Sequence, residues 1–197
     1  MTVKRLQRAK TAGYKAIVLT VDATVTSNRE RSTRLTGVPL PNLALGNVPK
    51  IPGVAGSAMA MKADLSWDDV AFCREQTGLP VIVKGILSAT QAAEAEKRGC
   101  AAVWPSNHGG RQLDNTPSAM TVLPRVAAAL KGRLPIILDG GFHRGQDVFR
   151  AIAQGASAVA LGRPLLYGSA LGGMQGVQSR FDPGQGELQK SRSRIFA

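Results

Sequence analysis

The chain has 197 residues, enough to bury one sizeable core, and its 44% hydrophobic residues and 22 glycines suit an α/β protein. Its 25 lysines and arginines exceed its 13 aspartates and glutamates, which gives a net charge of +12, but the basic residues are spread along the chain without interleaved aromatic residues, so we expect no nucleic-acid partner. The short apolar runs and the lack of an apolar secretory signal predict a cytoplasmic protein with no integral membrane segment. Both cysteines, Cys73 and Cys100, fit reduced thiols of the core.

The first third of the chain predicts a helix, a strand and a long irregular segment. Residues 1–12 are basic and faintly resemble a transit peptide, but apolar residues recur every three positions, which favours an amphipathic helix. Residues 16–22 are β-favouring and end on an acid, as a strand buried on both faces does. Residues 23–66 are rich in Pro, Gly and Asn, which indicates a functional lid or an insertion.

From residue 67 onward, strands and helices alternate regularly. Helices are predicted over residues 67–77, 88–98, 117–130 and 145–154 and from about residue 164. Strands are predicted over residues 79–85, 101–104, 134–139 and 157–162. This repeat favours parallel βαβ units with right-handed crossovers.

Each predicted strand ends in polar residues: Thr20 and Asp22, Lys84, Ser106 with His108, Asp139, and Gly162 with Arg163. Ligand sites of parallel α/β folds lie at these carboxyl ends. No Gly-x-Gly-x-x-Gly pattern follows an early strand, so we favour a (β/α)8 TIM barrel over a doubly wound sheet. Five strand–helix units are visible where a closed barrel needs eight, so the barrel is predicted to be incomplete.

Five short motifs occur at these strand ends: Leu19-Thr20-Val21-Asp22, Val83-Lys84-Gly85, Ser106-Asn107-His108-Gly109 continuing to Arg111-Gln112-Leu113-Asp114, Asp139-Gly140-Gly141, and Gly162-Arg163-Pro164. In order and spacing they resemble the FMN-dependent α-hydroxy-acid oxidases and dehydrogenases, a family that includes glycolate oxidase, lactate oxidase and mandelate dehydrogenase. Residues 171–176 are similar to the lactate-oxidising branch.

The resemblance implies that residues 1–178 form the C-terminal portion of the family's barrel, strands 4 to 8, with the first three β/α units absent. Residues 179–197 form an atypical C-terminal tail, for which a truncation or a shifted reading frame near Ser179 is our hypothesis. The implied reaction oxidises a lactate-like L-2-hydroxy acid to the 2-oxo acid. The implied cofactor is FMN, the electron acceptor is oxygen, a quinone or a cytochrome, and full-length members form homo-oligomers.

The resemblance also assigns roles to side chains. His108 is the base, Asp22 stabilises its imidazolium, and Arg29 and Arg111 grip the substrate carboxylate, a planar anion that suits guanidinium groups. His143 departs from the arginine that most members carry at this position. The implied FMN contacts are Thr20, Lys84, Ser106, Asp139, Gly140, Gly141, His143, Gly162 and Arg163, and no metal is expected.

Two alternatives stay open. The chain could be a catalytically inactive, truncated flavin-binding fragment, because three missing strands would expose two sheet edges. It could also be another FMN- or phosphate-binding barrel enzyme, such as an isomerase, although the pairing of His108 with Arg111 argues against this.

Overall fold

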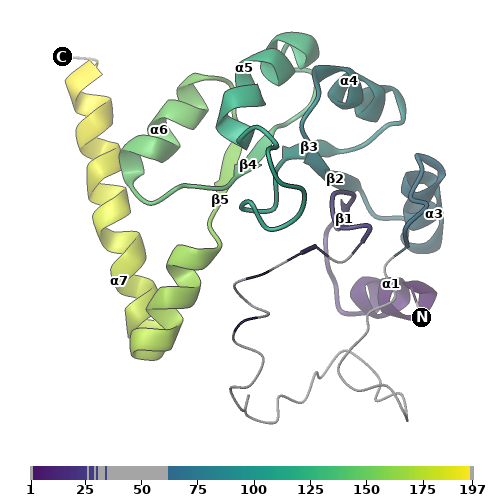
Figure 1. The fold of residues 1–197 in the computed structure, drawn as a ribbon, viewed down its shortest axis with the longest axis horizontal. Helices are drawn as coiled ribbons and strands as arrows, with labels where there is room; N and C mark the ends of the chain where they lie inside the picture. Colours follow the sequence, from purple (N-terminus) through teal and green to yellow (C-terminus); the bar gives the residue numbers. More distant parts are fainter. Residues whose placement is uncertain (1, 26, 29, 31–33, 35–61, 196–197) are drawn as a thin grey trace.

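In a computed structural model, parallel strands line up side by side and helices form an outer arc around them (Figure 1). The structure describes residues 2–25, 27–28, 30, 34 and 62–195, and of residues 181–195 it describes the backbone alone. The elements are α1 (Thr2–Thr11), β1 (Ile17–Thr20), α3 (Asp68–Thr77), β2 (Val81–Ile86), α4 (Ala89–Lys97), β3 (Ala102–Pro105), α5 (Ala119–Leu130), β4 (Ile137–Asp139), α6 (Gly145–Ala153), β5 (Ala158–Ala160) and α7 (Arg163–Ile195). The predicted alternation of strands and helices is confirmed.

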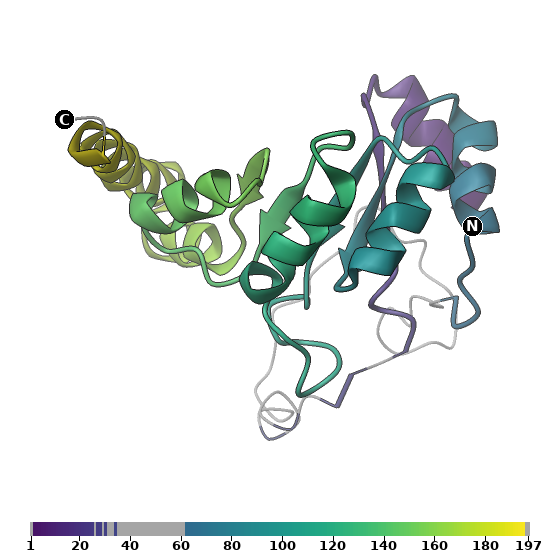
Figure 2. The ribbon, with the colours of Figure 1, turned by 90° about the horizontal axis from the view of Figure 1, so that it is seen from above.

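The strands pair in parallel throughout the described sheets. β1, β2 and β3 are neighbours in that order, and β4 pairs with β5. A parallel bridge between Val103 of β3 and Ile136 connects the two sheets into one row. Viewed from above, α1 and α3 flank one end of the row, and α6 and α7 flank the other (Figure 2). The α/β class predicted from the sequence is therefore confirmed.

The core lies between the strands and the outer helices. Val81 and Val83 of β2 are at most 1% exposed and belong to one buried cluster with Val70 of α3 and Leu123 of α5. Burying a side chain of this size contributes about 1.5–3 kcal/mol. Because side chains alternate along a strand, the same packing turns Lys84 to the opposite face of the sheet, which carries the polar residues.

Helix ends are held by polar contacts that keep the outer arc in place. Ser88 Oγ accepts a hydrogen bond from the backbone N–H of Gln91 at the start of α4. At the other end of α4, the Arg74 guanidinium of α3 donates to the carbonyl oxygens of Arg98 and Gly99, at 2.8 and 2.9 Å. These bonds satisfy carbonyl groups that a helix end leaves without partners, and they tie α3 to α4.

Several boundaries differ from those expected. β4 and β5 have three residues each, fewer than the predicted strands, and β3 covers Ala102–Pro105, one residue later than the apolar run over residues 101–104. Helix α7 runs on to Ile195 through the predicted tail, with non-helical dihedral angles at Gly172 and Gly173. In the part of the chain that the structure describes, no helix combines the length and apolar character needed to cross a membrane.

Candidate active site

The carboxyl ends of the strands surround a cavity of about 540 Å³, within the range of small-molecule sites. It is lined by β2 and by the segments that follow β3, β4 and β5. The predicted site residues that line it are Lys84, His108, Arg111, Asp139, Gly140, Gly141, His143, Gly162 and Arg163. Strand β2 and three separate βα connections thus contribute to one concave surface, as in enzymes built from parallel strands.

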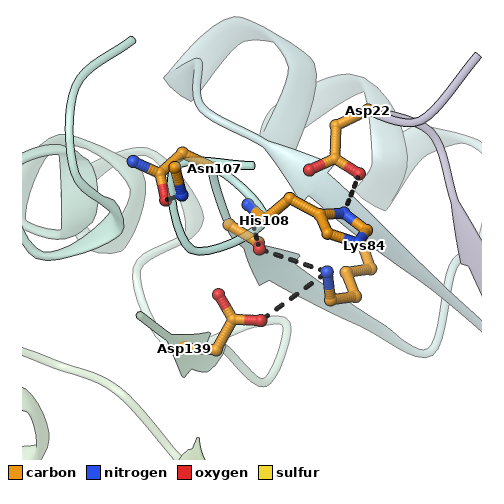
Figure 3. A network of polar contacts seen from close by, with 7 residues as sticks. Asp22, Lys84, Asn107, His108 and Asp139 are labelled. Carbon is orange, nitrogen blue, oxygen red and sulfur yellow. Dashed lines mark hydrogen bonds and ion pairs between the residues drawn. The ribbon is translucent and has the colours of Figure 1, made fainter. Parts of the chain in front are cut away.

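A histidine–carboxylate pair lies at the edge of this cavity. His108 follows β3 and Asp22 follows β1, and His108 Nδ1 lies 3.1 Å from Asp22 Oδ1 across 86 positions of sequence (Figure 3). The side chains are 32% and 13% exposed, so the pair is partly shielded from water. A carboxylate on Nδ1 orients the ring and leaves Nε2 available for proton transfer.

His108 belongs to a left-handed turn that side chains hold in place. Residues 108–110 have φ angles of 59°, 66° and 71°, a region that costs free energy for a residue with a Cβ. Ser106 Oγ accepts a hydrogen bond from the first backbone N–H of the turn at 2.9 Å, and Asn107 Oδ1 accepts one from the third at 3.2 Å. Arg163 Nη2 donates to the middle carbonyl oxygen at 3.0 Å. The turn is therefore fixed from three directions.

Lys84 connects the turn to the opposite wall of the cavity. Its side chain is 15% exposed, and Nζ donates to Ser106 Oγ at 3.2 Å and lies 3.6 Å from Asp139 Oδ2 (Figure 3). The ammonium group also lies 5.7 Å from the centroid of the Trp104 ring. A charge this well shielded needs such partners, and together they fix Lys84 Nζ at the cavity wall.

Three buried polar atoms at the site make no hydrogen bond within the part of the chain that the structure describes. Asp139 Oδ1, Asp22 Oδ2 and Trp104 Nε1 are buried and have no hydrogen-bond partner among the residues described. Unpaired buried polar atoms are costly, so those that adjoin a cavity point to a ligand. For Asp139, which lines the cavity, the expected partner is a ligand hydroxyl or N–H group.

Two glycine-containing segments form the far wall. Gly140 and Gly141 follow β4 with φ angles of 93° and 81°, and Gly162 follows β5. A Cβ at Gly141 or Gly162 would meet no atom within 4 Å, so the backbone faces open space that a ligand can approach closely. Helix α7 begins at Arg163, and the partial positive charge of a helix N-terminus adds to its guanidinium. This wall is suited to an anionic group.

The remaining predicted site residues lie beside the cavity or outside the described part. Asp22 contacts the cavity-lining residue His108, and Ser106 contacts the cavity-lining residue Lys84. Thr20 is the partner of Lys84 in the β1–β2 register. Arg29 lies outside the described residues. Among the residues that the structure does describe, no group of three or more His, Cys, Asp or Glu side chains could hold a metal ion.

Two residues at the site have structural roles that the sequence does not predict. Asn107 lies within a motif that assigns it no function, and Gly85 is predicted only as the end of a strand. A glycine inside an apolar strand pattern indicates a bulge or a close approach of backbones, so the signal for Gly85 was present. Asn107 carries no comparable local signal, because its bonds form only once the turn has folded.

Parallel βα units, a cavity at their carboxyl ends and a glycine–arginine wall define the class of α/β enzymes that bind phosphorylated cofactors. A family model described as FMN-dependent dehydrogenase matches residues 1–191, and the chain belongs to this family. The predicted resemblance is therefore confirmed.

Individual relatives agree with this assignment. An L-lactate oxidase from Nostoc sp. is 41% identical over 99% of this chain, and a peroxisomal (S)-2-hydroxyacid oxidase from Arabidopsis thaliana is 42% identical over 96%. A crystal structure of mandelate oxidase with (S)-2-phenylpropionate superposes on 98% of the chain with a TM-score of 0.85 and 34% identity. The chain covers 57%, 54% and 54% of these three proteins, so it spans about half the length of its relatives.

Proposed function

We propose that this chain carries the catalytic base, an arginine of the carboxylate clamp and most of the cofactor contacts of an FMN-dependent L-2-hydroxy-acid oxidase acting on a lactate-like acid. The observation that carries this proposal is the convergence of the His108–Asp22 pair and Arg111 on one cavity with a glycine–arginine wall. The relatives named L-lactate oxidase and (S)-2-hydroxyacid oxidase favour oxygen over a quinone or a cytochrome as electron acceptor.

We further propose that the five βα units correspond to strands 4 to 8 of an eight-stranded barrel. This is supported by the good superposition on about half of a relative and by the row of strands in which β1 and β5 each have one described neighbour. The boundary at residue 178 stays a prediction, and the family match runs past it to residue 191. The cytoplasmic location and the homo-oligomeric full-length state also stay predictions.

The residues present fit FMN. Asp139 Oδ1, buried and without a described partner, is suited to accept from a ribityl hydroxyl. Gly140, Gly141 and Gly162 leave room for a close approach, and Arg163 would bind the phosphate with His143 beside it. Thr20, Lys84 and Ser106 would contact the ring, and Ser106 Oγ, which already accepts from Lys84 and His108, still has a proton to donate. FMN supplies the chemistry of accepting the substrate's α-hydrogen.

The chain's own residues would bind the acid and move one proton. Arg111, together with Arg29, would hold the substrate carboxylate through paired N–H donors. His108 Nε2 would take the proton of the substrate hydroxyl, while Asp22 accepts from Nδ1–H and stabilises the cation that forms. Lys84 would place a positive charge beside the bound cofactor.

Binding and turnover can be tested on the purified chain. We expect FMN to bind with quenched fluorescence, and we expect L-lactate to give pyruvate and hydrogen peroxide. D-Lactate is the matched control, because it has the same composition and the wrong configuration for an L-specific site. Chain that stays colourless after refolding with excess FMN would contradict the proposal.

The same measurements separate the two alternatives. An inactive fragment would bind FMN and show a higher melting temperature with it, but would form no product. A different FMN-dependent barrel enzyme would bind FMN and leave it oxidised in the presence of every 2-hydroxy acid supplied. Peroxide formed with L-lactate excludes both.

A further inference from the structure

Gly85 of β2 lies directly against Asp22, with no room for a side chain between them. Its φ angle is +107°, a conformation that residues with a side chain rarely adopt. A Cβ at this position would lie 2.7 Å from both Cβ and Cγ of Asp22 and 2.9 Å from its backbone nitrogen. Ordinary contacts of a Cβ begin at 3.4 Å, so no side chain fits between Gly85 and Asp22.

The local hydrogen bonding explains why the two backbones meet here. The β2–β3 register shifts between Lys84 and Ile86, so that Gly85 is the extra residue of a β-bulge. One residue earlier, the carbonyl oxygen of Lys84 accepts a hydrogen bond from the N–H of Val21 at 2.8 Å. This bond holds the segment after β1 against the bulge. Because Asp22 directly follows Val21, the same bond places Asp22 beside Gly85.

We propose that Gly85 is a positioning residue for the catalytic pair. By leaving the space that a Cβ would fill, it lets Asp22 reach His108 Nδ1 at 3.1 Å. Relieving the clash of an alanine would move the Asp22 carboxylate carbon by about 0.7 Å, from 2.7 to 3.4 Å. Catalytic groups must be held within about 0.5 Å of their productive geometry, so this shift is large enough to matter.

The inference rests on the proposed role of His108 as base, but its first test requires neither FMN nor turnover. The sequence has two histidines, His108 and His143, so the imidazole NMR signals of the ligand-free chain can be assigned with a His143→Gln variant. We expect Gly85→Ala to shift the His108 ring signals in the same direction as Asp22→Asn. In the Asp22→Asn background, Gly85→Ala should add little further change, because its effect passes through the carboxylate.

Gly155→Ala is the matched control. Gly155 has a φ angle of +103°, and a Cβ there would lie 2.9 Å from the Cβ of Ala127, so the strain is similar but lies away from the cavity. Both variants should lower the melting temperature, and only Gly85→Ala should alter the His108 signals. Unchanged His108 signals in folded Gly85→Ala, or equal changes in both variants, would overturn the inference.

A second variant covers failure to fold. If Gly85→Ala is insoluble, Asp22→Gly in the same chain should restore folding, because it removes two of the three clashing atoms; no restoration would refute the steric account. With FMN and L-lactate, kcat of Gly85→Ala should fall about 100-fold while flavin content and KM change little. A wild-type chain that binds no flavin or shows no turnover would instead count against the proposed function. The NMR comparison of the ligand-free variants would still test the role of Gly85.

Discussion

Asn107 has no direct place in the proposed chemistry, yet its side chain holds the turn that presents the base. Its Oδ1 accepts from the N–H of Gly110 at 3.2 Å, and its Nδ2 donates to the carbonyl oxygen of Pro117 at 3.4 Å. The left-handed angle of His108 is unfavourable without such bonds. At the scale of single residues, the site therefore depends on amides and hydroxyls as much as on charges.

Replacing Asn107 tests this dependence. Asn107→Asp keeps the oxygen that accepts from Gly110, whereas Asn107→Ala removes it. We expect Asn107→Ala to lower kcat about tenfold or more and to speed amide hydrogen exchange at Gly109 and Gly110, because an unfavourable turn loses a bond worth about 1 kcal/mol. Asn107→Asp should retain slow exchange at Gly110. Equal exchange rates in the two variants would contradict this account.

The two cysteines report on the integrity of the core. Burial raises the pKa of Cys73, with a further contribution from the charge of Asp69, and burial also raises the pKa of Cys100, which nearby Arg74 partly offsets. A raised pKa keeps each thiol protonated in the folded chain. The associated stability is present below the unfolded-state pKa and is lost as the pH rises through the folded-state pKa.

Alkylation measures this protection. At pH 8 we expect iodoacetamide to label the folded chain slowly at both cysteines and to label the chain in urea rapidly, because the thiolate is the nucleophile. Labelling should also accelerate as the pH is raised further. Rapid labelling of native chain at pH 8 would show that the core around α3 and α4 is open.

At the scale of elements, the first part of α7 crosses its second part at two glycines. A Cβ added at Gly176 would overlap the carbonyl oxygen of Gly168, while a Cβ at Gly172 would meet nothing within 4 Å. We expect Gly176→Ala to destabilise the chain by about 1–3 kcal/mol, the usual cost of overpacking. Gly172→Ala is the control and should melt within about 1 °C of wild type, whereas equal melting temperatures for both variants would place the crossing elsewhere.

The elements themselves were largely predictable, and their details were not. In the sequence, a continuous apolar run marked β2, Ser88 marked the start of α4, and Gly78 marked the end of α3. Local sequence does not specify the left-handed angle of His108, because a histidine adopts it only when neighbouring side chains hold it there. The glycine of the bulge, Gly85, is visible in the sequence, but the residue that approaches it, Asp22, comes from a distant segment of the chain.

The candidate site was likewise predictable in part from the sequence. Strand ends placed His108, Lys84 and Asp139 together because carboxyl ends of parallel strands meet at one edge. The pairing of His108 with Asp22 came from the resemblance, since two residues 86 positions apart carry no periodicity that links them. The assignment of Arg29 stays a prediction, because it lies outside the described residues.

At the scale of the whole molecule, the cofactor should act as a structural component. Its proposed contacts come from β1, β2 and β4 and from the segments that follow β3, β4 and β5, so one ligand would connect both sheets. At an FMN concentration 100-fold above Kd, a folded state that alone binds it gains about 2.7 kcal/mol. For a chain of this size we expect the melting temperature to rise by about 5–10 °C, as measured by differential scanning calorimetry. Riboflavin, which lacks the phosphate, is the control and should give a smaller rise.

The central claim is that His108 takes the proton of a 2-hydroxy acid while FMN occupies the cavity, and anaerobic reduction of the bound flavin tests it most directly. Wild-type chain and His108→Ala, both loaded with FMN and equally yellow, would be mixed with L-lactate without oxygen. We predict that wild type loses the flavin absorbance while His108→Ala keeps both its flavin and its colour. Bleaching of His108→Ala at the wild-type rate, or a wild-type flavin that stays oxidised, would contradict the account.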